Sequence, residues 1–197
     1  KGEPTRQWRT MPDVMIAKVA EALARVVRVI PDPTNPLEAS IATTLSFVAA
    51  WAEEHGHTRI LAGQGADELF GGYARSLTSP DLAAELERDF ADLARQRTRD
   101  QAIAGLYGAY ISMPYLDVRV VRAARAIPAE EKVRGGVRKR PLREIAERHI
   151  PAEIARAEKK AMQYGSGIWR AMQRLSRDNG YKKSVQGYLT EISRWEH

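Results

Sequence analysis

The spacing of apolar residues predicts helices over most of this chain. Apolar positions recur every three or four residues in the segments 13–23, 37–51, 81–97, 99–110, 118–127, 168–175 and 181–195. Asp13 and Asp117 each stand just before the first apolar position of such a segment, where N-capping residues are common. Pro141 fits the first turn of a further helix. The pattern therefore predicts a helix-rich protein.

Two short segments predict strands instead. The segment 25–30 is rich in β-branched residues, and the brief apolar run 60–62 suits a buried core strand. Three prolines within 31–36 exclude both helix and sheet pairing between them. A helix at 37–51 followed by a strand near 60 is the crossover that a parallel sheet needs. We expect a helix-rich α/β protein with a small parallel sheet and a mainly helical C-terminal part.

The chemically most informative stretch runs from Arg59 to Tyr73 and reads RILAGQGADELFGGY. Gly63 and Gly65 flank a glutamine, and glycines can adopt a positive φ and let a ligand approach the main chain closely. Asp67 follows in the first turn of the next predicted helix. A carboxylate at such a loop can hold Mg²⁺, which in turn binds phosphate. The same pattern is also typical of a plain strand–helix turn with a capping aspartate.

Composition narrows the class of protein. The chain has 197 residues, of which 44% are hydrophobic, enough for one domain with a core. It has no uninterrupted apolar run of about 18 residues, so we expect no membrane helix. Cysteine is absent, which excludes disulfides, thiolate metal sites and a cysteine nucleophile, and this fits a cytoplasmic protein. The polar segment 1–12 is interpreted as a tail or linker and lacks the features of a secretory signal.

Charge is unevenly distributed along the chain. The net charge is +6, but the segment 119–183 alone carries 18 Lys and Arg against 7 Asp and Glu. A nucleic-acid surface and a site for phosphate-rich small ligands are two explanations. Solvated helix faces are the third, and we prefer it for most of these residues. Aromatic residues do not interleave with the basic run as a base-stacking surface requires, so no nucleic-acid partner is expected.

Four segments, taken in order, resemble the asparagine synthetase family. They read GQGADELFGGY, RDQAIAGLYGAYISMPYLDVRVV, PAEEKVRGGVRKRPLREIA and AEKKAMQYGSGIW. The resemblance extends over nearly the whole chain, and four motifs in the family's order are far more specific than one. It implies a single domain over 1–197 with the fold of the ATP-dependent synthetase domain, which is the adenine-nucleotide alpha-hydrolase-like fold of the PP-loop ATPases.

The resemblance also implies a reaction. In that family ATP adenylates the side-chain carboxylate of aspartate, diphosphate (pyrophosphate) leaves, and ammonia displaces AMP to form the amide. The implied cofactors are ATP and Mg²⁺, and the implied partners are small-molecule substrates, a separate glutaminase domain and a second copy of the chain in a homodimer. We expect no membrane partner and a location in the cytoplasm.

Particular residues match the family's site. Asp67 matches its magnesium-binding aspartate, and Lys159 matches the lysine that stabilises the diphosphate or the intermediate, with Lys160 as the rival. We expect Asp67 and Lys159 to face each other across one cleft. The residues expected to present their backbone to the nucleotide are Gly63, Gln64, Gly65, Gly165, Ser166 and Gly167. A plain helix stop is the alternative for the last three, and Lys132 and Arg143 are interpreted as structural ion-pair partners.

The sequence departs from the family in two places. Tyr110 and Ser112 stand where the family usually has Glu and Arg before its Pro-Tyr-Leu-Asp step. The family's phosphate loop, SGGxDS, does not occur in this sequence, so we expect the chain to begin downstream of that loop and its strand. These departures leave two alternatives open: a catalytically impaired nucleotide-binding or regulatory relative, and a tRNA-modifying PP-loop ATPase.

Overall fold

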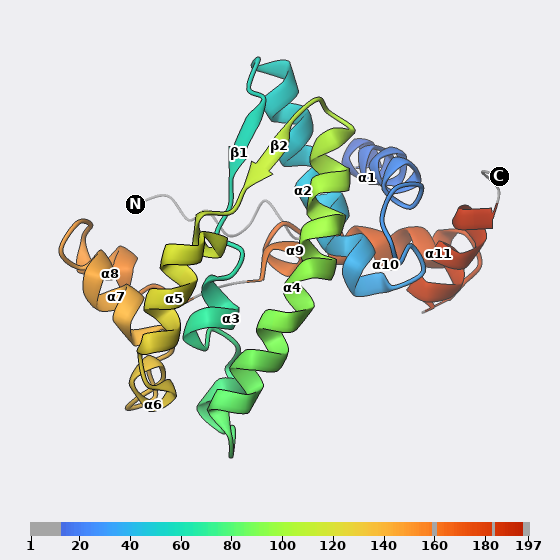
Figure 1. Cartoon of the computed structure of the whole chain (residues 1–197). Helices are drawn as coiled ribbons and strands as arrows, with labels where there is room; N and C mark the ends of the chain where they lie inside the picture. The colour runs from blue at the N-terminus through green and yellow to red at the C-terminus, as the bar shows by residue number, and fades with distance from the viewer. Residues whose placement is uncertain (1–12, 159–160, 183, 195–197) are drawn as a thin grey trace, which may run out of the picture. The chain divides into compact units, whose positions relative to one another are not determined.

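The computed structural model describes residues 13–158, 161–182 and 184–194 of the chain (Figure 1). Within these limits the chain forms two compact units. The first unit takes its residues from 1–60, 98–110 and 160–197, and the second from 61–97 and 111–159. Each unit is therefore built from segments that are distant in sequence, and each is described by itself.

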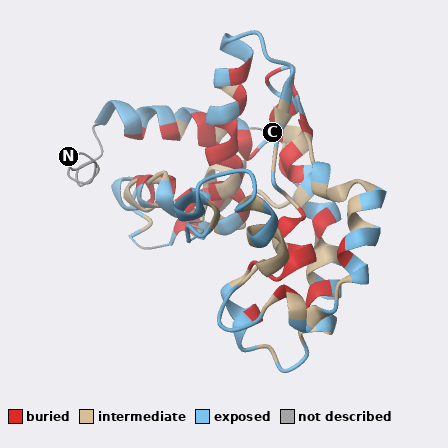
Figure 2. Ribbon diagram, turned by 90° about the vertical axis from the view of Figure 1, so that its left-hand side faces the viewer, coloured by how far each residue is buried: buried red, intermediate tan, exposed pale blue. Residues whose placement is uncertain are grey.

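The first unit is a group of helices packed around α2 (Pro36–Glu54). The helices in contact with α2 are α1 (Asp13–Val26), α9 (Met162–Gly165), α10 (Ile168–Asp178) and α11 (Val185–Arg194). Leu23, Met172 and Leu189 are fully buried among them. Figure 2 shows the buried residues in red along these helices. The amphipathic patterns of the first and last predicted helices therefore form one apolar core.

Capping and side-chain bonding explain why α2 tolerates many small polar residues. Asn35 caps the helix by accepting hydrogen bonds from the backbone N–H groups of Leu37 and Glu38. Thr43 and Thr44 are buried, and their hydroxyls donate to carbonyls one turn earlier at 2.7 and 2.8 Å. Because each hydroxyl has a partner within the helix, it can lie in an apolar interior without a desolvation penalty.

The helix α4 (Leu82–Gly105) is continuous where the sequence predicted two helices, 81–97 and 99–110. No glycine or proline lies between its first and last residues to interrupt it. Near the junction, the buried guanidinium of Arg99 donates to Glu38 at 2.9 Å and to Asp100 at 2.8 Å. The charged residues at this point are thus held in the interior of the first unit instead of ending the helix.

The strand predicted at 25–30 is wrong. Arg25 and Val26 are the last residues of α1, and turns follow at 27–30. Val26, Val27 and Ile30 are buried, so the β-branched side chains of this segment fix the end of a helix to the core. Tertiary packing has overridden the local β propensity here.

The sheet consists of β1 (Arg59–Leu61) and β2 (Tyr110–Ser112), which run parallel. The first strand lies where the sequence predicted one, but it is not buried as expected: Arg59 and Leu61 are exposed and Ile60 is only half-buried. Tyr110, which was expected to end a helix, begins the second strand. A helix-rich α/β chain with a small parallel sheet is therefore confirmed, while assignment to the PP-loop type stays an expectation.

Among the described residues, no helix combines the length and the apolar character needed to cross a membrane.

The second unit is made of short helices around an apolar centre. In chain order they are α3 (Ala66–Phe70), the 3₁₀ turns η1 (Ala74–Leu77) and η2 (Pro114–Leu116), α5 (Val118–Ala126), α6 (Ala129–Lys132), α7 (Arg140–Ala146) and α8 (Ala152–Ala155). Leu69, Phe70 and Ala124 form the buried centre. As predicted, Asp117 caps α5 by accepting from the backbone of Arg119 at 2.9 Å.

Candidate functional site

The loop before α3 is a tight turn that depends on Gly65. The backbone N–H of Ala66 donates to the carbonyl of Gly63 at 3.2 Å, and Gly65 has a φ of 94°. A Cβ at Gly65 would lie 2.7 Å from Leu116 Cδ2 and 3.1 Å from the Cβ of Tyr115. Gly65 is therefore fixed by backbone conformation and by the close packing of η2, without reference to a ligand.

Gly63 differs from Gly65. Its φ is not positive, which corrects the expectation that both glycines use that conformation, and a Cβ built on it would meet nothing within 4 Å. Gly63 is also exposed. The fold of the second unit therefore does not require glycine at 63, and the open space beside its backbone is compatible with the expected approach of a nucleotide.

Asp67 lies in the first turn of α3, as predicted, and its carboxylate is paired with a lysine of the same unit. Lys139 Nζ lies 2.7 Å from Asp67 Oδ1, and the two side chains are 22% and 14% exposed. Gly72 lies directly beside this pair, since a Cβ there would be 1.7 Å from Asp67 Oδ1 and 2.5 Å from Lys139 Cε. The early helix stop at Gly71 and Gly72 therefore makes room for the ion pair.

Lys139 was missed as a site residue. It precedes α7 with φ 53° and ψ 36°, the left-handed conformation that costs an ordinary residue on the order of 1–2 kcal/mol. The ion pair with Asp67 helps to offset that cost. The signal that would have found Lys139 is the second lysine in the motif PAEEKVRGGVRKRPLREIA, which stands three positions before the leucine of the Leu-Arg step.

Glu68 supports the loop from the inside. It is 4% exposed, and its Oε1 accepts a hydrogen bond from the hydroxyl of Tyr73 at 2.6 Å. Burial, followed by this hydrogen bond to Glu68, raises the pKa of Tyr73 well above its usual value. Gln96 Nε2 lies 3.4 Å from the same Oε1. Tyr73 therefore anchors the chain after α3, and the carboxylate next to Asp67 is structural.

The loop 165–167 belongs to the first unit, whereas the loop 63–67 belongs to the second. Gly167 has a φ of 82° and stands at the start of α10. The hydroxyl of Ser166 lies 3.4 Å from both the carbonyl of Gln163 and the backbone N–H of Ile168. These local contacts support the interpretation of a helix break. A role for this loop with a nucleotide stays a prediction.

The remaining predicted residues fall into two groups. Lys159 and Lys160 lie outside the described residues. The preference for Lys159 over Lys160, and the expectation that Lys159 faces Asp67 across a cleft, therefore stay predictions.

Lys132 is buried, and that burial is the main cause that lowers its pKa. Arg143 is structural as expected, but among the residues that the structure describes it bonds to carbonyls and not to a carboxylate: it donates to Arg138 O at 3.0 Å and to Ala155 O at 3.1 Å.

The donor set around Asp67 limits the kind of metal site. The described residues contain no group of three or more His, Cys, Asp or Glu arranged to hold a metal. Magnesium commonly takes one or two protein carboxylates and completes its shell with waters and phosphate oxygens. Asp67 therefore fits a magnesium ion that arrives with a nucleotide, provided that the ion shares or displaces the Lys139 ammonium, and it does not fit an all-protein metal cage.

Comparison with known proteins agrees with this arrangement of motifs. The sequence model of the family described as asparagine synthase matches residues 9–110 and 102–189. The chain belongs to the asparagine synthase family. The two matched segments contain the loop 63–67, Lys139 and the loop 165–167, so the site described above lies within the family's own sequence pattern.

Individual relatives of this asparagine synthase family member are only moderately similar. A Methanocaldococcus jannaschii protein named as a glutamine-hydrolyzing asparagine synthetase is 29% identical over 91% of this chain and 39% of its own length. Asparagine synthetase B of Escherichia coli is 30% identical over 55% of this chain and 21% of its own. Carboxyethyl-arginine beta-lactam-synthase of Streptomyces clavuligerus is 32% identical over 62% of this chain and 24% of its own length. The chain thus spans about two fifths or less of these relatives.

Proposed function

We propose that this chain is part of an ATP-dependent amide-forming ligase of the asparagine synthetase type. The observation that carries the proposal is the loop–helix unit of the family motif, in which a turn at Gly63–Gly65 leads directly into the Asp67 carboxylate. Membership of the asparagine synthase family supports it. Aspartate or a related carboxylic acid, ATP and ammonia are the proposed substrates.

The proposed reaction joins two transfers. A carboxylate oxygen of the acid attacks the α-phosphorus of ATP, the bond to the bridging oxygen breaks, and diphosphate leaves. Ammonia then attacks the acyl carbon, AMP leaves, and the nitrogen releases a proton. Both steps build negative charge that cationic groups must stabilise. Magnesium, when bound with the nucleotide, would offset the charge on the phosphate oxygens.

The residues of this chain have assigned parts in the proposal. The backbone at Gly63, Gln64 and Gly65 would lie against the nucleotide, and Asp67 would hold the magnesium. Lys159 would stabilise the departing diphosphate, and the backbone of 165–167 would contact phosphate. The ammonia would come from a glutaminase domain or from solution, and the protein would act in the cytoplasm, as a homodimer. These assignments rest on the family motifs.

The test is exchange of radiolabelled diphosphate into ATP, measured on the full-length protein with aspartate and related acids. We expect acid-dependent exchange that is lost in Asp67→Asn and Lys159→Ala. Lys160→Ala is the matched control and should retain exchange. An active Lys159→Ala with an inactive Lys160→Ala would reverse the choice of lysine, whereas no exchange with any carboxylic acid would overturn the ligase proposal.

One observation favours a second candidate function, a nucleotide-binding relative that does not turn over. Tyr110 and Ser112 occupy the two ends of β2 in place of the acid and the base usual in the family. Calorimetric titration with ATP separates the two candidates, because saturable binding without exchange supports the binding module. Binding of tRNA that weakens steeply with salt would instead support the tRNA-modifying alternative.

A further inference from the structure

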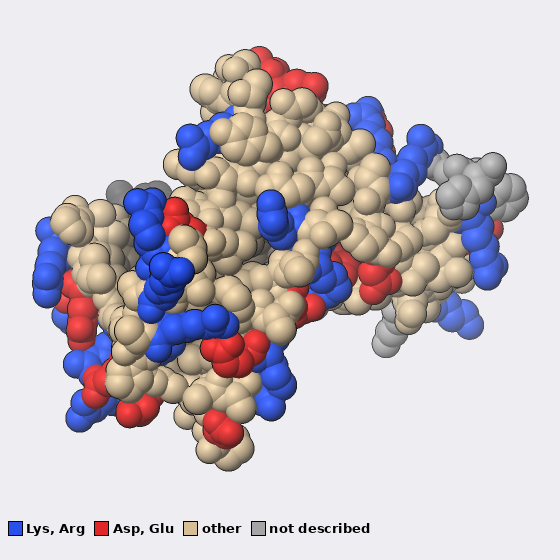
Figure 3. Space-filling view, in the orientation of Figure 1, with Lys and Arg blue, Asp and Glu red and all other residues tan. Residues whose placement is uncertain are grey.

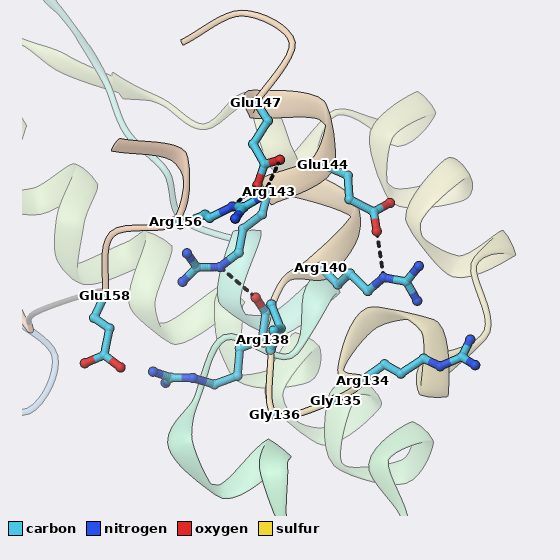
Figure 4. A pocket seen from close by; sticks show the side chains of 11 residues that line it. Arg134, Gly135, Gly136, Arg138, Arg140, Arg143, Glu144, Glu147, Arg156 and Glu158 are labelled. Atoms are coloured by element: carbon cyan, nitrogen blue, oxygen red, sulfur yellow. Dashed lines mark hydrogen bonds and ion pairs between the residues drawn. The ribbon is translucent and has the colours of Figure 1, made fainter. Parts of the chain in front are cut away.

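Part of the second unit surrounds a cavity of about 900 Å³ that the proposed reaction does not use (Figure 4). It lies between the turn 134–137, the helix α7 and the segment 156–158. Five arginines and three glutamates line it, together with two glycines and one valine. Its lining is therefore strongly polar, with an excess of positive charge. Figure 3 shows lysine and arginine side chains gathered over α5 to α8, with acidic ones among them.

The backbone of the turn 134–137 brings these arginines together. Arg134 and Val137 exchange backbone hydrogen bonds at 3.1 and 3.0 Å. Gly135 and Gly136 between them both have positive φ values, 60° and 76°, as a type I′ turn requires. The chain then enters α7 immediately through Lys139. The arginine that begins this compact turn and the arginines that follow it consequently share one cavity.

Three of the lining arginines are neutralised within the protein. Arg134 pairs with Glu131 at 2.8 Å, and Arg140 pairs with both Glu131 at 2.8 Å and Glu144 at 2.6 Å. Arg156 pairs with Glu147 at 2.6 Å. These guanidinium groups already have carboxylate partners, so they offer little to a further anion.

Arg138 and Arg143 are different. Arg138 Nη1 donates to the carbonyl of Gly72 at 2.8 Å, and Arg143 donates to the carbonyls of Arg138, Ala155 and Ala157. Neither guanidinium has an ion pair with a carboxylate among the described residues. A guanidinium has five N–H donors, so each keeps donors that these bonds do not use. Both residues are half-buried, which strengthens their attraction for an anion.

The directions of the side chains agree with this division. In Figure 4 Arg138 and Arg143 extend toward the same side of the cavity, where Glu158 also lies, whereas Arg134 and Arg140 extend toward the opposite side. Glu158 has no ion pair with any residue that the structure describes. Two cationic groups of fixed position therefore face one region of the cavity. The carboxylate of Glu158 on the same side offsets part of their positive charge.

We propose that this cavity binds a multivalent oxyanion, a phosphate or diphosphate group, between the guanidinium groups of Arg138 and Arg143. Guanidinium groups bind such oxyanions through paired charge-assisted hydrogen bonds. The group comes either free or as the phosphate end of a nucleotide. The inference does not depend on the proposed ligase function, because it uses only the charges and contacts of the second unit.

Calorimetric titration of the full chain with inorganic phosphate, diphosphate, AMP and ATP tests it. Arg138→Gln and Arg143→Gln should each weaken diphosphate binding by about tenfold or more, because each removes a charge-assisted contact. The matched control is the double variant Arg156→Gln with Glu147→Gln, which removes a lining arginine together with its partner. It leaves the net charge unchanged and should bind diphosphate within about twofold of the parent.

A variant that gains affinity keeps the test decisive if Arg138→Gln or Arg143→Gln fails to fold. Glu158→Gln removes the opposing carboxylate and should strengthen diphosphate binding severalfold. A larger loss of affinity for ATP than for diphosphate in Arg138→Gln assigns the nucleotide as the source of the anion in this cavity, and the reverse assigns free diphosphate. Absence of saturable binding of all four probes overturns the proposal, as does equal weakening in the control and in Arg138→Gln, or unchanged affinity in Glu158→Gln.

Discussion

The carboxylate of Asp67 and the ammonium of Lys139 form an ion pair at 2.7 Å, although 72 residues separate them in sequence. The pair joins the first turn of α3 to the start of α7 within the second unit. An aspartate that the sequence marks as a metal ligand is thus also a structural residue. The observed ion pair and the expected metal role make separate predictions.

Lys139→Met should lower the free energy of unfolding by about 1–3 kcal/mol, because it leaves the largely buried Asp67 carboxylate without its cation. Lys139→Arg keeps the positive charge and should lower the free energy of unfolding by less. Urea denaturation measures both, and a double-mutant cycle with Asp67→Asn isolates the pair. A cycle that gives no coupling energy would contradict the structural role of this contact.

Gly72→Ala should also destabilise the second unit, by about 1–3 kcal/mol, because the new methyl group overlaps Asp67 Oδ1. Gly63→Ala is the matched control, since its methyl group meets nothing within 4 Å and its φ is not positive. Thermal unfolding of the two variants compares them. If Gly63→Ala unfolds at the parent temperature but binds ATP more weakly, the backbone at 63 contacts the nucleotide as proposed.

Arg99→Met should destabilise the first unit by about 3–5 kcal/mol, because it leaves Glu38 and Asp100 as buried charges without this cation. The control lies on the same helix: Arg95 pairs with Asp92 at 2.7 Å where both side chains are over 40% exposed. Arg95→Met should change stability by only about 0.5 kcal/mol. Similar losses in the two variants would show that burial does not set the strength of these pairs.

Asp117 should contribute a pH-dependent part of stability. Hydrogen bonds from the side chain and then the backbone of Arg119 lower the pKa of Asp117 from 3.8 to about 2. A lowered folded-state pKa stabilises the fold above the ordinary value, and this contribution is lost as the pH falls from about 4 to 2. Asp117→Asn keeps a capping side chain without the charge. The stability gap between parent and variant should therefore narrow over that range, and a constant gap would contradict this account.

Local signals in the sequence predicted much of the fold because they act within one element. Asp117 and Pro141 mark helix starts through backbone geometry, and glycines after Phe70 end α3. The strand predicted at 25–30 failed for the opposite reason, because packing of Val26 and Ile30 in the core decided its structure. A sum of local preferences does not contain that information.

The candidate site was predictable only in part. The motif placed Asp67 in the first turn of a helix, which is a local property. Its partner Lys139 comes from a distant segment of the chain. Lys139 also takes a left-handed backbone conformation that lysine does not favour. The spacing of residues along the sequence therefore does not reveal the contact. The charge excess at 119–183 likewise does not reveal which arginines are neutralised, because ion pairs such as Arg125 with Glu87 join separate segments.

The crowding of Gly72 by the side chain of Asp67 has an evolutionary consequence. A mutation that adds a side chain at 72 is harmful while an aspartate stands at 67, and should become tolerable once that aspartate is replaced by a smaller residue. The order of the two changes therefore matters: a lineage can lose the aspartate first and the glycine afterwards. In homologues, a bulky residue at 72 should then mark descendants that have already lost the aspartate at 67.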